Sequence, residues 1–410
     1  MSLPRYEAYK DSGVEWIGEI PEGWEVKRLK YVAKICTEKA EEGAEKVALE
    51  NIESKTGRYI ASETAFDGEG VRFNQGNILY GKLRPYLAKV WVADFDGTAV
   101  GDFFVIKAAH NLTSSYLKYR LLSAEFTDLA NGSTFGSKMP RVDKAFLTDL
   151  PFSVPTLPEQ TAIASFLDRK TAEIDQLIAN KEKLIALYEE EKTAIINRAV
   201  TRGGLDSQVV LKPSGVDWLG DIPEHWEVKR LKYVVETIAG GGTPATGNPA
   251  FWHGSIPWVS PKDMKVDEIT ETEDYVTESA VTNSSTTLVE ANRILLVVRS
   301  GILKHSLPVA INKVSVCLNQ DMKAIKPIND IDLKFFFWKL KGLSKDILTT
   351  CNKMGATVDS IEMSDLLDFL FTFPPHPEQT AIVTHIETEC ARLDTIIARV
   401  CSQSRHPYNG

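Results

Sequence analysis

The sequence predicts an α+β protein with two globular α/β domains that are separated by long helices, and the helices are expected to pair as an antiparallel coiled coil. Three observations lead to this architecture. A segment of 24 residues recurs 202 positions later, a second recurring segment has the apolar periodicity of a helix, and short β-rich runs lie between them. Each copy therefore combines a repeated frame with a variable region of its own.

The first repeated segment opens each copy. Residues 9–32 and 211–234 are identical at 18 of 24 positions, and both contain the string WEVKRLKYV. A period of this length indicates a duplicated domain, because solenoid repeats have periods of about 20–50 residues. Four tryptophans recur in the two copies, at Trp16, Trp24, Trp218 and Trp226. Residues that read different targets should differ between the copies, so we expect these rings to pack in the core.

The variable regions, residues 33–154 and 235–373, align poorly with each other. Both contain β-rich runs among Gly, Pro and Asn turns: NILYGKL, LAKVWVA and DFFVIKA in the first, and RILLVVRS, LPVAIN and VSVCLN in the second. Helical segments follow each set, SSYLKYRLLSAEFTDLA and LKFFFWKLKGLSKDILTT. We therefore expect each domain to be α+β.

The second repeated segment opens the long helices. PTLPEQTAI from Pro155 and PPHPEQTAI from Pro374 begin stretches with 11 identities in 26 positions at an offset of 219. Apolar residues then recur every three or four positions, and 44 residues would form a rod roughly 66 Å long. The second helix lacks a counterpart of residues 181–202, so we expect it to be shortened. The predicted divisions are residues 1–157, the helix 158–202, residues 203–376, the helix 377–400 and a tail, 401–410.

Composition and charge fit an ordinary globular protein. No apolar run approaches the ~20 residues that span a bilayer, and the five scattered cysteines favour a cytoplasmic protein over a disulfide framework or a zinc site. The net charge of −9 hides a segregation of charge. Residues 70–141 carry nine Lys/Arg against five Asp/Glu, residues 291–353 carry eleven against four, and residues 262–290 carry two against eight. The two variable regions therefore contain basic stretches that suit a polyanion.

Motifs for catalysis are weak. GGGTPATGNP at 240–249 lacks the Lys-Ser/Thr that a phosphate-binding loop requires after its last glycine. NPAF at 248–251 lacks the second proline of the tetrapeptide that grips a flipped adenine in amino-methyltransferases, and no histidine pair has ligand spacing. We therefore expect no catalytic residue, no metal site and no cofactor site in this chain.

Binding of nucleic acid is better supported. The turn GKLRPYL offers two cations and an aromatic ring, and GSTFGSKMPR is a polar loop suited to hydrogen bonds with a nucleic-acid backbone. The candidate DNA-binding residues are Lys82, Arg84, Tyr86, Ser133, Thr134, Ser137, Lys138 and Arg141 in the first domain, and Thr243, Ser260, Lys262, Arg299, Lys304, His305, Asn319, Gln320 and Thr357 in the second.

These motifs resemble the specificity (S) subunit of type I restriction-modification systems. The doubled IPEGWEVKRLKYV/IPEHWEVKRLKYV, the doubled PEQTAI, LYGKLRPYL, and GGTP followed by NPAFWHGSIPWVSPKDM carry the resemblance, in the family's order. It implies that each domain is a target-recognition domain for one half of a bipartite, asymmetric DNA sequence, and that the helices are a spacer. A rod of roughly 66 Å would span ~20 base pairs.

The resemblance also implies partners. Two methyltransferase (M) subunits would bind S-adenosylmethionine and methylate adenine, and restriction (R) subunits would use ATP and Mg²⁺, all on double-stranded DNA. The alternative from another class is a duplicated scaffold that binds proteins instead of DNA. A stand-alone methyltransferase is a third possibility, which the missing donor-binding motif disfavours.

Overall fold

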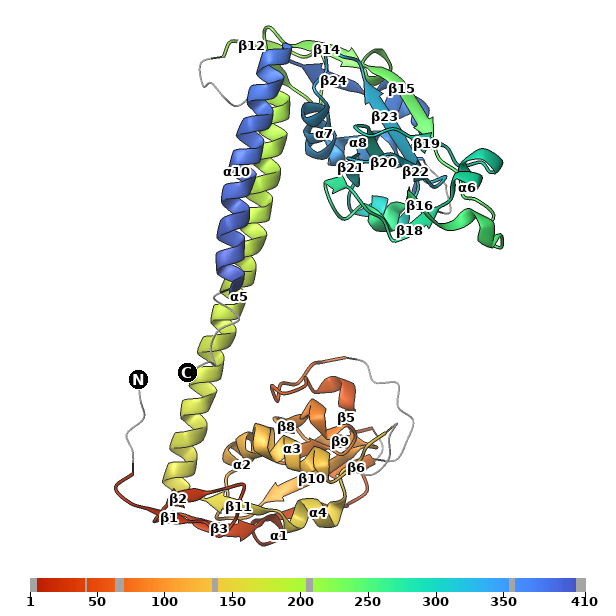
Figure 1. Cartoon of the computed structure of the whole chain (residues 1–410). Helices are drawn as coiled ribbons and strands as arrows, with labels where there is room; N and C mark the ends of the chain where they lie inside the picture. The colour runs from red at the N-terminus through yellow and green to blue at the C-terminus, as the bar shows by residue number, and fades with distance from the viewer. Residues whose placement is uncertain are drawn as a thin grey trace. The chain divides into compact units, whose positions relative to one another are not determined.

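The computed structural model describes residues 6–40, 43–62, 70–134, 139–203, 209–353 and 358–402. It divides into two compact units, unit 1 (Met1–Leu177) and unit 2 (Ile178–Gly410). Both units mix helices with β-sheets, and the long helix α5 (Leu157–Arg202) continues through the boundary (Figure 1). The predicted fold class is confirmed.

The frame of unit 1 is built from short antiparallel pairings. Strands β1 (Tyr9–Asp11) and β2 (Glu19–Pro21) form a hairpin, and β3 (Glu25–Arg28) pairs with β11 (Pro151–Val154) from the end of the variable region. The short helices α1 (Leu29–Val32) and α4 (Lys144–Asp149) lie against each other beside this pair. The two ends of the variable region are therefore held at one place.

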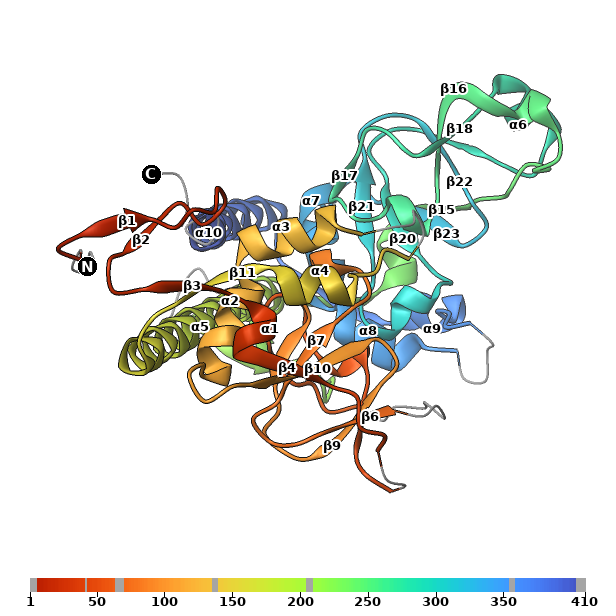
Figure 2. The ribbon, with the colours of Figure 1, turned by 90° about the horizontal axis from the view of Figure 1, so that it is seen from below.

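The variable region of unit 1 is a sheet covered on both faces. Its order is β4-β10-β7-β8, and the bounds are β4 (Ala33–Cys36), β10 (Phe103–Ala108), β7 (Ile78–Gly81) and β8 (Val90–Val92). Tyr80 and Phe104 pack on the side of α2 (Ser114–Leu122) and α3 (Ala124–Gly132). Side chains alternate along a strand, so Leu79 and Val105 face the other side. There a second sheet lies, ordered β5-β9-β6, with β5 (Lys46–Val47), β9 (Gly97–Val100) and β6 (Gly70–Phe73) (Figure 2).

Unit 2 repeats this plan. Strands β12 (Leu211–Pro213) and β13 (Asp221–Pro223) form the hairpin, and β14 (Glu227–Arg230) pairs with β24 (Leu370–Phe373). The main sheet has the order β15-β23-β20-β21-β17, in which the first four strands take the places of β4, β10, β7 and β8. Their bounds are β15 (Val235–Gly240), β23 (Met322–Pro327), β20 (Ile294–Val297), β21 (Val309–Asn312) and β17 (Glu268–Ile269).

The second sheet of unit 2 is larger than that of unit 1, which accommodates the extra length of this copy. Its order is β18-β16-β22-β19, with β18 (Asp274–Val276), β16 (Trp252–Val259), β22 (Val316–Leu318) and β19 (Leu288–Val289). The variable region of this unit contributes the helices α6 (Glu278–Asn283), α7 (Leu333–Gly342), α8 (Ser344–Cys351) and α9 (Met363–Asp368). Short 3-10 turns occur in both units. Turns η1 and η2 lie in unit 1, at Leu49–Asn51 and Pro85–Leu87. Turns η3 to η6 lie in unit 2, at Leu231–Tyr233, Pro249–Phe251, Pro261–Asp263 and Gly301–Lys304.

The long helices start in the same way in both copies. At the start of α5, the Gln160 amide accepts from the Thr113 backbone N–H (2.8 Å) and donates to the Asn111 and Pro155 carbonyls. At the start of α10 (His376–Ser402), Gln379 makes the equivalent three bonds, beginning with the Asp332 N–H (2.8 Å). Each glutamine is buried and fully used, which explains why the Pro-Glu-Gln string recurs.

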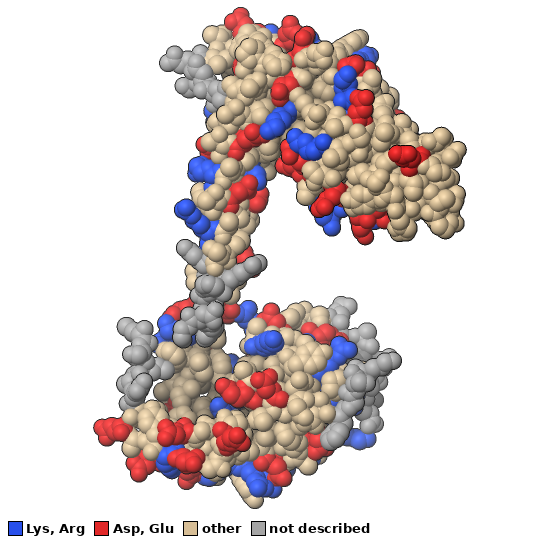
Figure 3. Space-filling model, viewed as in Figure 1, with Lys and Arg blue, Asp and Glu red and all other residues tan. Residues whose placement is uncertain are grey.

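Within unit 2, α10 runs antiparallel to the end of α5 (Figure 1). Lys192 pairs with Asp394 (2.7 Å), and Arg392 lies 3.8 Å from Glu191. Basic and acidic side chains are interspersed on the visible face of the paired helices (Figure 3). The antiparallel helix pairing predicted from the apolar stripes is confirmed. Among the described residues, no helix combines the length and apolar character needed to cross a membrane.

The tryptophan prediction holds for one ring of the four. Trp226 is fully buried, whereas Trp218 is 38% exposed, and Trp16 and Trp24 are half-buried. The prediction of core packing is therefore wrong for Trp218. Burial depends on which helix covers the frame of each unit, and the repeated strings alone do not reveal that.

Candidate nucleic-acid interface

The predicted basic turn of unit 1 follows β7 and is held in an unusual backbone conformation. Arg84 and Ala88 have positive φ angles of 51° and 44°, and Pro85 opens the 3-10 turn η2 between them. Left-handed backbone at a residue other than glycine costs about 1–3 kcal/mol and requires support from its surroundings. The Arg84 N–H donates to the Pro140 carbonyl (2.8 Å), and the Lys82 carbonyl accepts from the Val142 N–H (2.9 Å). The turn is therefore fixed to the segment around residues 140–142.

The hydrogen bonds between the turn and residues 140–142 bring Arg141 close to the basic residues of the turn. Arg141 forms an ion pair with Asp102 (2.9 Å), and Lys82 Nζ lies 4.8 Å from the centre of the Phe104 ring. Burial lowers the pKa of Lys82, an effect that Asp102 opposes. Arg84 is exposed, and Tyr86 is 45% exposed. The turn thus presents one open guanidinium and one open aromatic ring.

The polar loop after α3 is described only in part. Ser133 Oγ donates to the Ala130 carbonyl and Thr134 Oγ1 donates to the Asn131 carbonyl, both at 2.8 Å, so these hydroxyls bond to the end of α3. Helix α3 lies against η2, which places this loop next to the basic turn. Ser137 and Lys138 lie outside the described residues.

In unit 2, four predicted residues meet around one carboxylate. Asp321 accepts from Arg299 Nε (2.6 Å), Asn319 Nδ2 (3.4 Å) and Gln320 Nε2 (3.2 Å). Thr243 Oγ1 donates to the Gln320 side-chain carbonyl. Asp321 therefore orients an amide and a guanidinium, the two side-chain types that form paired hydrogen bonds with adenine and guanine edges.

Among the other predicted residues of unit 2, Ser260 and Lys262 are engaged by acidic side chains, whereas Lys304 and His305 are exposed. Ser260 is buried, and its N–H and Oγ both bond to Asp263, while Lys262 pairs with Asp274 (2.8 Å) and Glu273 (3.1 Å). Lys304 lies 3.9 Å from Asp359, and His305 is exposed at the end of the 3-10 turn η6. Thr357 lies outside the described residues.

The two motifs that resembled catalytic sequences have structural roles. A Cβ at Gly241 would stand 2.2 Å from the Asn319 carbonyl oxygen, and one at Gly242 would stand 2.4 Å from that of Ser285. Only glycine fits where these backbones approach. The Asn248 side chain accepts from the Ala250 N–H (3.1 Å) and caps the 3-10 turn η4. Within the described ranges, no three His, Cys, Asp or Glu residues are grouped so as to hold a metal ion.

Sequence reasoning missed a basic cavity in unit 1. A hollow of about 600 Å³ is lined by four basic residues, one carboxylate and three amides: Lys30, Lys34, Arg72 and Lys107, then Glu38, then Asn74, Gln75 and Asn77. Lys34 and Lys107 are directly opposite each other in the antiparallel pairing of β4 with β10. Like charges at such positions are destabilising without an anion between them. No sequence signal marks this site, because the three strands that supply it are distant in the chain.

The comparisons with known proteins agree with this picture. The family model for the type I restriction modification DNA specificity domain matches residues 21–186 and again residues 223–397. The specificity subunit of the type I restriction enzyme EcoR124I/EcoR124II of Escherichia coli is 33% identical over 322 residues, which are 75% of this chain and 70% of that protein. The putative type I restriction enzyme MjaX specificity subunit of Methanocaldococcus jannaschii is 24% identical over 398 residues, 90% of this chain and 88% of that protein.

Solved structures show the same fold. A chain from the work "Structural basis underlying complex assembly and conformational transition of the type I R-M system" matches with a TM-score of 0.73 at 18% identity, over 94% of both chains. The HsdS subunit of Thermoanaerobacter tengcongensis matches with a TM-score of 0.55 at 17% identity, over 94% of this chain and 95% of that one.

Two copies of one DNA specificity domain, each joined to a long helix, define a subunit that confers sequence specificity on a larger enzyme. The chain belongs to the type I restriction-modification DNA specificity family, and it is a DNA specificity subunit. The alternative of a scaffold that binds only proteins is not favoured.

Proposed function

We propose that each unit binds one half of a bipartite, asymmetric target in double-stranded DNA, and that the chain itself catalyses no reaction. Partner methyltransferase subunits, two for the two units, would methylate adenine with S-adenosylmethionine. Partner restriction subunits would cleave DNA with ATP and Mg²⁺. The chain would decide where both reactions occur.

One observation carries this proposal: the two frames make the same contacts while the loops they hold differ. In unit 1, Trp24 Nε1 donates to Glu159 (3.1 Å), and in unit 2, Trp226 Nε1 donates to Glu378 (3.0 Å). The loop after β7 instead carries Arg84 and Tyr86, where the loop after β20 (Ile294–Val297) carries Arg299 beside Asp321. Identical supports with different loops are what two readers of unlike half-sites require.

The chemistry of the loops suits double-stranded DNA. Exposed cations neutralise phosphates and release counterions, and a guanidinium or amide aimed into the major groove distinguishes guanine from adenine. Arg84 in unit 1, and Arg299 with Gln320 in unit 2, are the groups we assign to base edges. The cations around the cavity of Lys34 and Lys107 would contact the phosphate backbone.

Single-molecule sequencing of DNA methylation would test the proposal. Cells that carry this chain with its neighbouring methyltransferase are compared with cells that lack only this chain. We expect a split, asymmetric adenine-methylation motif that depends on the chain. Arg84→Ala should change or abolish recognition of one half of the motif, and the matched variant Arg299→Ala should affect the other half. A motif that persists without the chain, or a single change that alters both halves alike, would refute the assignment.

A further inference from the structure

The basic turn of unit 1 ends against a second turn, residues 53–58. The Lys55 N–H donates to the carbonyls of Leu87 (3.1 Å) and Ala88 (3.2 Å), where η2 ends. Lys55 and Ala88 both have left-handed backbone, with φ angles of 66° and 44°. Left-handed residues other than glycine persist only where their surroundings hold them. The hydrogen bonds of Lys55 therefore help to fix the shape of the basic turn.

A lysine side chain makes a second link to the same region. Lys89 follows η2, and its Nζ donates to the carbonyls of Leu49 and Ile52, each at 2.7 Å. Both acceptors lie shortly before the 53–58 turn in the chain. The C-terminal end of the basic turn is thus held to this region by the backbone and by a side chain.

The other side of the 53–58 turn reaches α5. The Arg58 guanidinium forms an ion pair with Asp175 of α5 and lies 3.9 Å from Glu53 of its own turn. Thr56 Oγ1 donates to the same Glu53 carboxylate (2.6 Å). Arg58 is therefore held between two carboxylates, one on the turn and one on the helix. The turn connects α5 to the end of the basic turn.

Helix α2 touches the same face of α5. Tyr119 Oη donates to Asp168 (2.5 Å), and Lys118 Nζ lies 3.2 Å from that carboxylate. Burial, together with the hydrogen bond to Asp168, raises the pKa of Tyr119 to about 12. Asp168 and Asp175 are seven residues apart, which is close to two helical turns. The variable region is therefore attached to α5 at two successive levels of one face.

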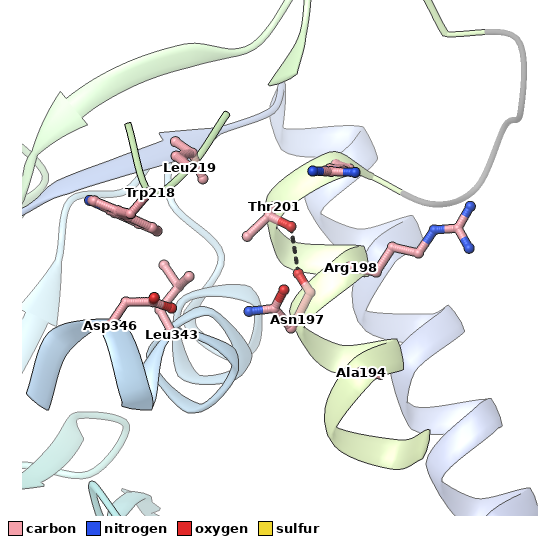
Figure 4. A pocket seen from close by; sticks show the side chains of 9 residues that line it. Ala194, Asn197, Arg198, Thr201, Trp218, Leu219, Leu343 and Asp346 are labelled. Carbon is pink, nitrogen blue, oxygen red and sulfur yellow. Dashed lines mark hydrogen bonds between the residues drawn. The ribbon is translucent and has the colours of Figure 1, made fainter. Parts of the chain in front are cut away.

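Unit 2 attaches its variable region differently. An offset of 219 relates Asp175 to Asp394, which pairs with a lysine of α5 (2.7 Å). The contact between α5 and the variable region is made by Asn197, whose side chain donates to the Gly342 carbonyl (2.9 Å). Figure 4 shows Asn197 on the side of α5 that faces Leu343. Equivalent aspartates thus have different partners in the described parts of the two units.

We infer that Arg58 is a positioning residue, which fixes the basic turn of unit 1 to α5 and thereby restricts the length of the gap between the two half-sites. This inference rests on the proposed function, in which Arg84 of the basic turn contacts DNA. Successive base pairs are about 3.4 Å apart. Freedom of a few ångströms at the turn would let it reach a half-site one base pair nearer or farther.

Methylation sequencing of cells that carry the full chain and its neighbouring methyltransferase tests the inference. Arg58→Ala and Asp175→Asn should keep both half-site sequences but methylate targets with a gap one base pair longer or shorter roughly two- to fivefold more, the range expected for an exposed ion pair. Arg58→Lys keeps the charge and should lie between Arg58→Ala and the wild type. An unchanged gap in both Arg58→Ala and Asp175→Asn, or an altered base in the first half-site with the gap unchanged, would overturn the inference.

The control is an ion pair on the other side of the same helix. Lys170 pairs with Glu173 (2.6 Å), and these residues lie away from the face of Asp168 and Asp175, because a helix turns by about 100° per residue. Lys170→Ala should leave the gap unchanged, and a wider gap in this variant would attribute the effect to α5 in general and so refute the role of Arg58.

Hydrogen exchange of the purified chain gives a second readout, which requires no DNA. Arg58→Ala should speed exchange of the Lys55 amide by roughly two- to fivefold, whereas Lys170→Ala should not. Equal exchange in Arg58→Ala and the wild type would overturn the inference. A wild-type chain that directs no split motif would refute the proposed function and the role in the gap together, whereas a motif whose gap ignores Arg58 would refute this inference alone.

Discussion

Replacing Lys339 by methionine should change how the stability of unit 2 depends on pH. Lys339 is fully buried, and no acidic side chain in the described part of the chain pairs with it, so burial holds the pKa of its amine well below the ordinary value. Between that lowered pKa and about 10.4, the unfolded chain binds a proton that the folded chain does not bind. The free energy of unfolding of the wild type therefore rises with pH across this window, by at most about 1.4 kcal/mol per pH unit from this group.

The methionine variant removes this contribution and two hydrogen bonds. The Val200 carbonyl and Thr372 Oγ1 lose their donor, at a cost of about 1–3 kcal/mol for each buried group left unsatisfied. At high pH the variant should be the less stable protein. As the pH falls through the window, the difference should shrink by up to about 1.4 kcal/mol per unit, because only the wild type must lose a proton on folding.

Guanidinium unfolding of the full chain at several pH values measures this difference. Pulse-labelling hydrogen exchange of peptides from α7 and β24 reports on unit 2 alone. Lys341→Met is the matched control, since Lys341 lies on the same helix but pairs at the surface with Asp267 (2.6 Å), a contact worth at most about 1 kcal/mol at any pH in this range. Parallel pH profiles for Lys339→Met and the wild type would refute the reasoning.

Three further predictions follow from the structure. If Arg84 contacts a phosphate, Arg84→Ala should weaken DNA binding and reduce the slope of log affinity against log salt concentration by about one. If Arg84 contacts a base edge, the variant should instead lose sequence specificity at one base position. A titration at several salt concentrations that shows neither effect would exclude the turn from the DNA interface. Gly203→Ala should destabilise unit 2 by about 1–2 kcal/mol, because Gly203 follows α5 with a positive φ of 78°. The control variant Gly301→Ala changes a glycine without a positive φ and should leave the stability unchanged. Thermal unfolding of both variants measures the difference. Lys107→Ala should stabilise unit 1 by about 0.2–1 kcal/mol by removing the repulsion from Lys34, and a stability loss in denaturant unfolding would contradict this account.

The sequence predicted the duplicated frame and the long helices because these depend on local signals. Gln160 and Gln379 make identical bonds in both copies, so their strings recur nearly unchanged. The candidate site was predicted less completely. The basic turn at Arg84 was visible as a motif, but its attachment to Pro140 depends on a pairing 56 positions apart in the chain. Lys34 and Lys107 meet only because β10 pairs with β4, and nothing in either strand alone indicates that contact.

The pairing of β3 with β11 and of β14 with β24 has an evolutionary consequence. Each variable region leaves and re-enters its frame at one antiparallel strand pair, so both of its ends are anchored side by side. A foreign variable region could be inserted between the same two strands by genetic exchange without disturbing the tryptophan–glutamate contacts of the frame. New sequence preferences could then arise by recombination in one step, without gradual remodelling of the helices.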